Sequence, residues 1–256
     1  MQLKKLLKRV SISCQMYGPL RRTYQRLFNS EVEKRFWNDV AFYKQFVSPT
    51  DLCFDVGANI GEKTEVFLAL GARVVSFEPQ PNCFREMKAR CGPSRRLTAV
   101  NAAVGAVPGR RSMYVKENPS VSSLMPDWDS TNLREVIQVP VTTLDEAIDR
   151  YGVPQFCKID VEGYELEVLK GLSRPLPVVS IEYHLNEKDI AKIFNCVDYL
   201  CRLGELEINI TLGEKMQFTW PKWVAYESFR NYFPSRAPRT ESCGYGDLFI
   251  RIAPPR

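Results

Sequence analysis

The chain has 256 residues, of which 45% are hydrophobic and 25% charged. This composition is that of a globular protein with room for one α/β domain and an added arm. The net charge of +5 is unevenly placed, because residues 1–36 hold nine basic side chains and two acidic ones. The remainder is therefore slightly acidic, which excludes a basic nucleic-acid surface beside the chemistry.

The cysteine and histidine content argues against a metal site. The eight cysteines include no Cys-x-x-Cys pair, and His184 is the only histidine. Ligand sets of the zinc type need such residues in clusters, so we assign no metal ligands, and a metal held by carboxylates stays open as an alternative. Free cysteines inside apolar runs, such as Cys53 and Cys157, are typical of a reduced cytoplasmic protein. No apolar run reaches the roughly 20 residues of a membrane-spanning helix, and we expect no signal peptide.

Residues 1–47 are predicted to form a basic, helical N-terminal arm. Apolar side chains recur at helical spacing between the basic ones, at Leu3, Leu6, Leu7 and Val10. A helix of this kind suits peripheral contact with an anionic membrane, packing in a homodimer, or a solvated surface. The main domain is predicted to span residues 48–256, after the turn signals at 48–51.

From residue 52 onward, apolar runs alternate with helical segments. Strands are expected at 52–56, 73–77, 97–100, 156–159, 178–183 and 247–252, and helices at 62–70, 82–90, 143–150, 164–170 and 188–203. This alternation predicts a doubly wound α/β fold, with a mainly parallel sheet and helices on both faces. Residues 105–140 interrupt it with two further strands around a polar loop, an inserted segment where substrate contacts are expected.

Polar side chains are predicted at the carboxyl ends of these strands. In an open α/β sheet, ligands bind beyond the carboxyl ends, near the point where the strand order reverses. The residues expected there are Asp55, Glu78, Asn101, Asp160 and His184. These positions are where the chemistry should be sought.

The first strand end predicts a nucleoside cofactor. The turn Asp55-Val56-Gly57-Ala58-Asn59-Ile60-Gly61 allows close approach of backbone to a ligand. Glu78 ends the second strand, where a carboxylate can bind two ribose hydroxyls. Asp55 would repel the pyrophosphate of NAD or NADP, but would attract the sulfonium and ammonium groups of S-adenosylmethionine. The residues therefore favour S-adenosylmethionine.

Four stretches in order resemble the FkbM-type methyltransferases. They are residues 55–61, Phe77-Glu78-Pro79, Asn101-Ala102-Ala103-Val104-Gly105 and Lys158-Ile159-Asp160-Val161-Glu162-Gly163-Tyr164-Glu165, with a weaker echo at 246–250. The resemblance covers residues 51–184 and implies the Rossmann-like fold of class I methyltransferases. It also implies S-adenosylmethionine as cofactor and methyl transfer to a hydroxyl oxygen of a sugar, glycan or natural product.

The resemblance assigns residues to parts of the cofactor and the acceptor. It implies Asp55, Gly57, Ala58, Asn59 and Gly61 around the methionine part, Glu78 and Pro79 at the ribose, and Asn101 and Ala102 near the adenine. It places Asp160 where the cofactor faces the acceptor, and Ser122 and Ser123 in a serine-containing loop near the substrate.

Two residues are candidates for the proton acceptor. His184 ends a strand that faces the predicted site, and imidazole accepts protons near neutral pH. Asp160 borders the same space and is the alternative. Glu162 either contacts the substrate or complements a helix N-terminus. Because a sulfonium donor is already activated, alignment of the reactants supplies most of the catalysis.

Two other functions stay open at this point. A nicotinamide-dependent oxidoreductase shares the sheet, although Asp55 opposes a pyrophosphate. The second is a methyltransferase-like domain that has lost activity and serves as an interaction module. Such a domain would not need Asp55, Gly57, Gly61, Glu78 and Asp160, so their presence weighs against it. Binding of S-adenosylmethionine or NAD separates the first alternative from the methyltransferase.

Overall fold

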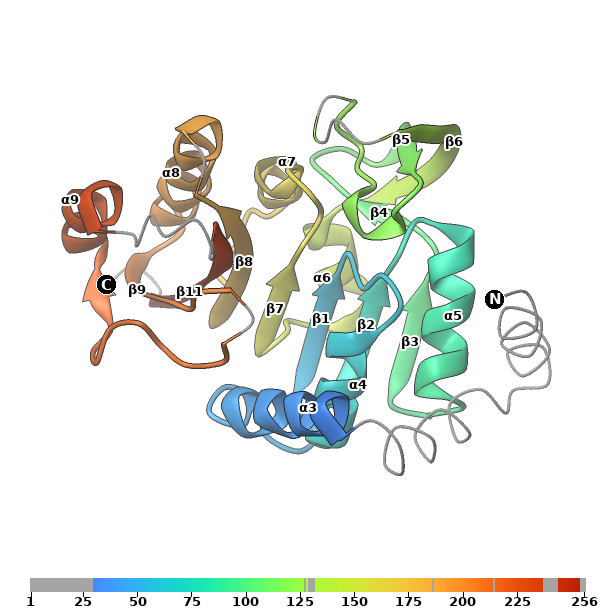
Figure 1. Ribbon diagram of the computed structural model, residues 1–256, viewed down its shortest axis with the longest axis horizontal. Coiled ribbons are helices and arrows are strands. Elements are labelled where there is room, and N and C mark those ends of the chain that lie inside the picture. Colours follow the sequence, from blue (N-terminus) through green and yellow to red (C-terminus); the bar gives the residue numbers. More distant parts are fainter. Residues whose placement is uncertain are drawn as a thin grey trace.

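The computed structural model describes residues 30–253, except 127, 129–131, 186, 214 and 237–243. Most of its strands form one sheet (Figure 1). These strands are β1 (Leu52–Val56), β2 (Arg73–Phe77), β3 (Leu97–Val100), β7 (Phe156–Ile159), β8 (Val178–His184), β9 (Glu205–Ile210), β10 (Val224–Ala225) and β11 (Tyr245–Ala253). Their order in the eight-stranded sheet is β10-β9-β11-β8-β7-β1-β2-β3.

The strand order confirms the doubly wound, mainly parallel sheet. From β3 through β2, β1 and β7 to β8, neighbouring strands are parallel, whereas β11 is antiparallel to both β8 and β9. The chain runs outward from β1 to β3 and then returns to β7 on the other side of β1. The order therefore reverses between β1 and β7, where such sheets bind their ligands.

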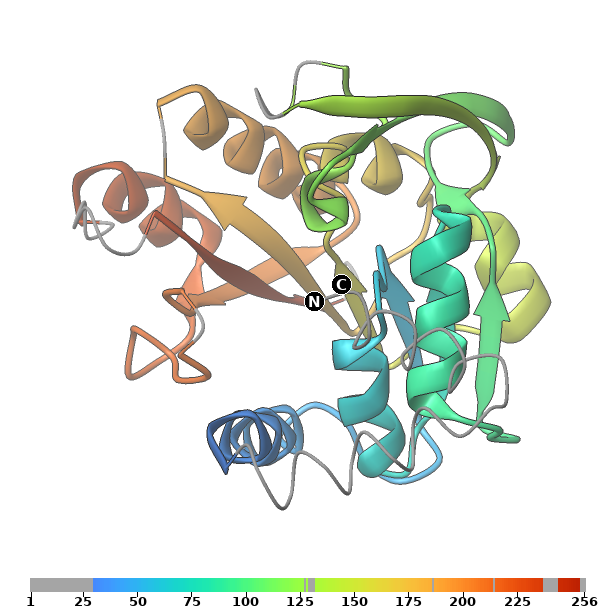
Figure 2. The same ribbon diagram turned by 45° about the vertical axis from the view of Figure 1, so that its right-hand side comes forward.

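Helices pack on both faces of this sheet (Figures 1 and 2). They are α3 (Ser30–Tyr43), α4 (Glu62–Ala69), α5 (Pro81–Cys91), α6 (Leu144–Tyr151), α7 (Glu165–Lys170), α8 (Glu187–Cys201) and α9 (Tyr226–Arg236). Side chains alternate along β1, so Cys53 joins the core with α3, α4 and α5, and Phe54 joins the core with α6, α7 and α8. Among the described residues, no helix combines the length and apolar character needed to cross a bilayer.

The helix α3 lies within the stretch predicted as the N-terminal arm. Its end, with the turn after it, packs into the domain, because Phe42, Tyr43 and Phe46 are buried. The Phe46 ring stacks on Phe249 of β11 with 5.3 Å between centroids. This part of the arm therefore contributes to the core of the main domain. The predicted basic helix at residues 3–10 lies outside the described residues.

The predicted insertion at 105–140 forms a second, small sheet. It contains β4 (Ala103–Val104), β5 (Gly109–Lys116) and β6 (Leu133–Thr142) in the order β4-β6-β5, with the short helix η1 (Pro119–Val121) after β5. The sequence predicts strands at 112–116 and 136–139, and both are longer in the structure, where β5 and β6 pair from Gly109 opposite Val141 to Lys116 opposite Leu133. Figure 1 shows this sheet beyond the carboxyl ends of β1 and β2.

The start of α6 and the end of α7 depend on different features. The capping box of α6 is present, with Glu146 N donating to Thr143 Oγ1 (3.1 Å) and Thr143 N donating to Glu146 Oε2 (3.3 Å). Gly171 follows α7, and its φ of −85° is open to any residue. A Cβ at this position would lie 2.3 Å from the backbone oxygen of Gly105, so close packing is what requires glycine.

Candidate active site

The pairing register brings three predicted residues to one edge of the sheet. Val56 of β1 is paired with Phe77 of β2 and with Ile159 of β7. The next residue on each strand is therefore Gly57, Glu78 or Asp160. All three line a cavity of about 310 Å³, the size of a small-molecule site, at the switch point of the sheet.

The turn after β1 needs its glycines for conformation and for space. Gly57 has a φ of +81°, and a Cβ there would lie 1.7 Å from the backbone oxygen of Asp160. Gly61 has a φ of +84°, and its Cβ would lie 2.7 Å from Cγ of Met87 on α5. Gly57 and Asn59 line the cavity. Gly61 instead lets the start of α4 pack closely on α5.

Glu78 is held with its carboxylate at the cavity. The backbone N–H of Asn59 donates to Oε2 and that of Gln80 donates to Oε1, each at 2.7 Å. The side chain is almost fully buried, and burial raises the pKa of Glu78 to about 7 despite these two hydrogen bonds. Both oxygens keep a lone pair for a further donor, which is what binding two ribose hydroxyls requires.

Several predicted cofactor residues lie behind the cavity wall. Asn101 Nδ2 donates to the backbone oxygens of Glu78 (2.8 Å) and Pro79 (3.1 Å), so it holds the loop after β2. The buried carboxylate of Asp55 accepts from Thr64 Oγ1 at 2.5 Å, and burial raises its pKa. Pro79 lines the cavity, whereas the predicted residues that do not line it are Asp55, Ala58, Gly61, Asn101 and Ala102.

The inserted segment covers the cavity from the other side. Asn59 Nδ2 donates to Ser120 Oγ at 3.3 Å, and Gln80 Nε2 donates to the backbone oxygen of Pro119 at 3.0 Å. Ser122 and Ser123, predicted near the substrate, both line the cavity. Ser123 Oγ also donates to the backbone oxygen of Glu162 at 2.7 Å. The insertion is thus hydrogen-bonded to the loops after β1 and β2 and to Glu162 after β7.

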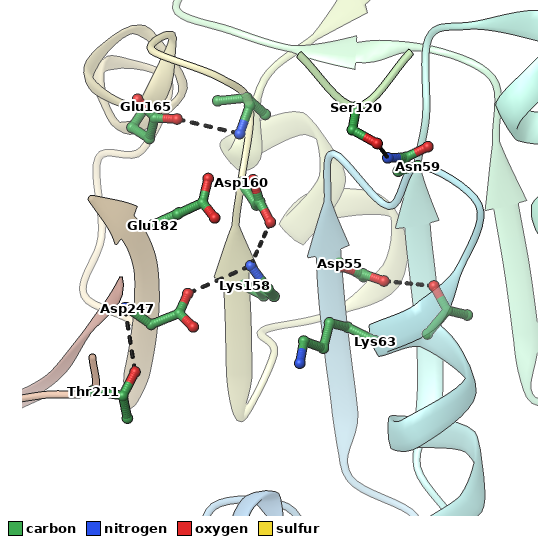
Figure 3. A network of polar contacts seen from close by, with 12 residues as sticks. Asp55, Asn59, Lys63, Ser120, Lys158, Asp160, Glu165, Glu182, Thr211 and Asp247 are labelled. Carbon is green, nitrogen blue, oxygen red and sulfur yellow. Dashed lines mark hydrogen bonds and ion pairs between the residues drawn. The ribbon is translucent and has the colours of Figure 1, made fainter. Parts of the chain in front are cut away.

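A buried lysine organises the carboxylates beyond β7 (Figure 3). Lys158 Nζ lies 2.8 Å from Asp160 Oδ2 and 3.6 Å from Asp247 Oδ1. Burial alone would lower the pKa of Lys158 and raise that of Asp160. The surrounding charges and hydrogen bonds together outweigh burial, so the pKa of Lys158 is raised, by Asp160 and Asp247 above all, and that of Asp160 is lowered, by Lys158 above all.

Predicted residues Glu162 and His184 lie together with Glu182, which was not predicted. Trp128 Nε1 donates to Glu162 Oε2 at 2.8 Å, and His184 Nε2 lies 3.6 Å from Glu182 Oε2. Burial, followed by the charge of Asp160, raises the pKa of Glu162 to about 8 and also raises that of Glu182.

These three side chains present one ligand atom each within 4.8 Å of one another. Oxygen and imidazole ligands at such separations suit either a divalent cation or proton exchange. Glu162 and Glu182 line the main cavity, whereas His184 borders a smaller one of about 20 Å³ that also contacts Glu182. Contrary to prediction, His184 therefore does not line the main cavity.

The cavity residues that the sequence did not assign to the site include Arg35, Tyr164 and Glu182. Glu182 had a visible signal, since it lies two residues before His184 on the same predicted strand and so shares its face. Arg35 had none, because it comes from α3 and reaches the cavity only through tertiary packing.

This strand order, with a glycine turn and a buried carboxylate at its switch point, is that of an α/β fold that binds a nucleoside-containing ligand. Residues 55–245, well over half the chain, match the family model described as the methyltransferase FkbM domain. The chain therefore belongs to the FkbM methyltransferase family, whose cofactor is S-adenosylmethionine. The predicted family, fold and cofactor are confirmed.

One curated relative and two solved structures illustrate the likeness. Hexuronic acid methyltransferase AglP of Haloferax volcanii is 26% identical over 152 residues, which are 57% of this chain; the match spans 62% of the relative's length. A TehB-like S-adenosylmethionine-dependent methyltransferase of Corynebacterium glutamicum has a TM-score of 0.45 at 10% identity, covering 93% of this chain and 96% of its own. Precorrin-6y C5,15-methyltransferase of Geobacter metallireducens has a TM-score of 0.44 at 11% identity, covering 84% and 87%.

Proposed function

We propose that this protein transfers the methyl group of S-adenosylmethionine to a hydroxyl oxygen of a sugar, glycan or natural-product acceptor. The observation that carries the proposal is a single cavity with two unlike ends. One end has the glycine turn and Glu78, and the other has Asp160, Glu162 and Glu182 with the serines of the insertion. Support for a sugar comes from the relative that is named for hexuronic acid.

The donor end fits the cofactor that the family uses. Gly57 and Asn59 would lie along the methionine part, and Glu78 would accept from the ribose hydroxyls. Asp55 would act from behind the turn, by holding Thr64 and through its charge. Bound there, S-adenosylmethionine supplies an electrophilic methyl group beside the acceptor. The pyrophosphate of NAD would face the carboxylates of Glu78, Asp160 and Glu162, which disfavours an oxidoreductase.

The acceptor end has the groups that bind and deprotonate a hydroxyl. Carboxylates accept hydrogen bonds from sugar hydroxyls, and Ser122 and Ser123 lie opposite them. The proton released on methylation goes to the acid–imidazole group at the ends of β7 and β8, which contains the predicted pair Asp160 and His184. Holding the hydroxyl oxygen in line with the methyl group contributes most of the rate.

Calorimetry followed by an acceptor screen tests this proposal. We expect S-adenosylmethionine and S-adenosylhomocysteine to bind and NAD not to bind. Labelled S-adenosylmethionine should then transfer its methyl group to some member of a panel of sugars, uronic acids and hydroxylated natural products, with Glu78→Ala as the blank. Preferential binding of NAD would refute the proposal. Tight cofactor binding without transfer to any acceptor would favour an inactive, methyltransferase-like interaction module.

A further inference from the structure

We propose that Glu182 is the catalytic residue that takes the proton from the acceptor hydroxyl, and that His184 receives it next. The inference rests on the proposed methyl transfer to oxygen. In that step the new O–CH₃ bond forms as the S–CH₃ bond breaks, the sulfonium becomes a neutral thioether, and the hydroxyl proton passes to a Glu182 carboxylate oxygen.

The pairing register places Glu182 beside Asp160. Ile159 of β7 is paired with Ile181 of β8, so the next residues, Asp160 and Glu182, stand side by side. Asp247 of β11 is paired with Glu182. Three carboxylates therefore share one level and one face of three adjacent strands. Figure 3 shows the Glu182 side chain extending from β8 toward Asp160, whose carboxylate contacts Lys158.

Lys158 makes the basicity of these three carboxylates unequal, because it forms ion pairs with two of them. It lies two residues before Asp160 on β7 and so points to the same face. Its ion pairs are with Asp160 at 2.8 Å and Asp247 at 3.6 Å. Asp160 is thereby kept ionised and weakly basic, since the ammonium stabilises its charge. The fixed charge of Asp160, together with burial, favours a proton on Glu182 and makes it the stronger base.

Glu182 also has the access that a base requires. It lines the main cavity with a side chain that is 22% exposed, and its Oε2 lies 3.6 Å from His184 Nε2. The Glu162 carboxylate is instead held by the Trp128 N–H. The charged and titratable groups that face the Glu182–His184 pair are Lys158 and Asp160 of β7, Glu162 after it, Asp247 and Tyr245 of β11, Glu165 of α7 and Lys192 of α8.

The first test is turnover of Glu182→Gln, with glucuronic acid as the acceptor. General-base help is worth about 10²–10⁴ in rate, so kcat should fall at least about a hundredfold. The dissociation constant of S-adenosylhomocysteine should stay within about twofold, and Glu207→Gln, an exposed change on β9, should behave as wild type. In the wild type, kcat should fall as the pH drops through about 7, because protonated Glu182 cannot accept the proton, and the variant should lack this fall. Near-normal turnover with that fall intact would overturn the proposal. So would activity that EDTA abolishes and Mn²⁺ restores, because the cluster would then be a metal site.

The second test needs no acceptor. His184 is the only histidine, so its imidazole signals can be followed by NMR in the full-length protein. An opposite charge at this distance shifts a titration by about one pH unit or more. In Glu182→Gln the imidazole midpoint should therefore move to lower pH by about one unit, with no movement in Glu207→Gln. An unchanged midpoint would overturn the inference. A wild-type protein that methylates nothing while the midpoint moves would count against the proposed function alone.

Discussion

Lys158 Nζ lies 2.8 Å from Asp160 Oδ2 in an ion pair at the end of β7, and the lysine side chain is only 4% exposed. They share a face because they are two positions apart. Charges at this depth are tolerated only when they are paired and hydrogen-bonded. The pair joins β7 to β11 through Asp247 and sets the charge state of the site's carboxylates.

Replacing Lys158 should destabilise the protein. In Lys158→Met, Asp160 and Asp247 lose their buried counter-ion, and breaking a buried pair in this way costs about 3–5 kcal/mol. Lys170→Met removes an exposed pair with Glu167 and should cost at most about 1 kcal/mol. Denaturant unfolding of both variants measures the two losses. Similar, small losses would show that the buried lysine is not needed to hold β7 and β11 together.

Glu78 should account for much of the affinity for the nucleoside. Glu78→Ala removes the carboxylate that faces the cavity, and hydrogen bonds to a charged group are worth about 1.5–3 kcal/mol. Binding of S-adenosylhomocysteine should weaken by roughly tenfold or more, with the unfolding midpoint little changed. Glu135→Ala, an exposed change on β6, serves as the control. Unchanged affinity in Glu78→Ala would remove the ribose assignment.

Cofactor binding should weaken as the pH falls below neutrality. Burial raises the pKa of Glu78 to about 7, and the ionised form is the better acceptor for ribose hydroxyls. The complex therefore binds fewer protons than the free protein, so affinity is greatest above pH 7 and is lost as the pH falls through it. Calorimetry with S-adenosylhomocysteine between about pH 8 and 6 measures this. A slope that persists in Glu78→Gln would assign the effect to other groups.

The sequence predicted the sheet and several residues that line the cavity, but not those that reach it through tertiary packing. Gly57, Glu78 and Asp160 lie at strand ends, where local pattern and sheet topology determine position. Asp55 was expected in contact with the cofactor, but on the strand its side chain turns toward Thr64 of α4. Arg35 belongs to a segment distant in sequence, and only the packing of α3 brings it to the cavity.

Arg35 should contribute to cofactor binding through its charge. It lines the cavity from α3 and is exposed, so attraction to the carboxylate of the methionine part is worth at most about 1 kcal/mol. Arg35→Gln should weaken S-adenosylmethionine binding by up to about fivefold, and added salt should reduce the difference. The neighbouring Lys34→Gln carries the same change in charge outside the cavity and should bind normally. Equal losses in both variants would indicate a general charge effect.

The position of the transferred methyl group tests the central claim most directly. The full-length protein would be incubated with methyl-labelled S-adenosylmethionine and the sugar and uronic-acid panel, and the product examined by NMR for the atom that bears the label. We predict a labelled methyl ether on a hydroxyl oxygen, with one S-adenosylhomocysteine formed for each methyl group transferred. A label on nitrogen, on carbon or on a carboxylate as an ester would contradict methyl transfer to a hydroxyl.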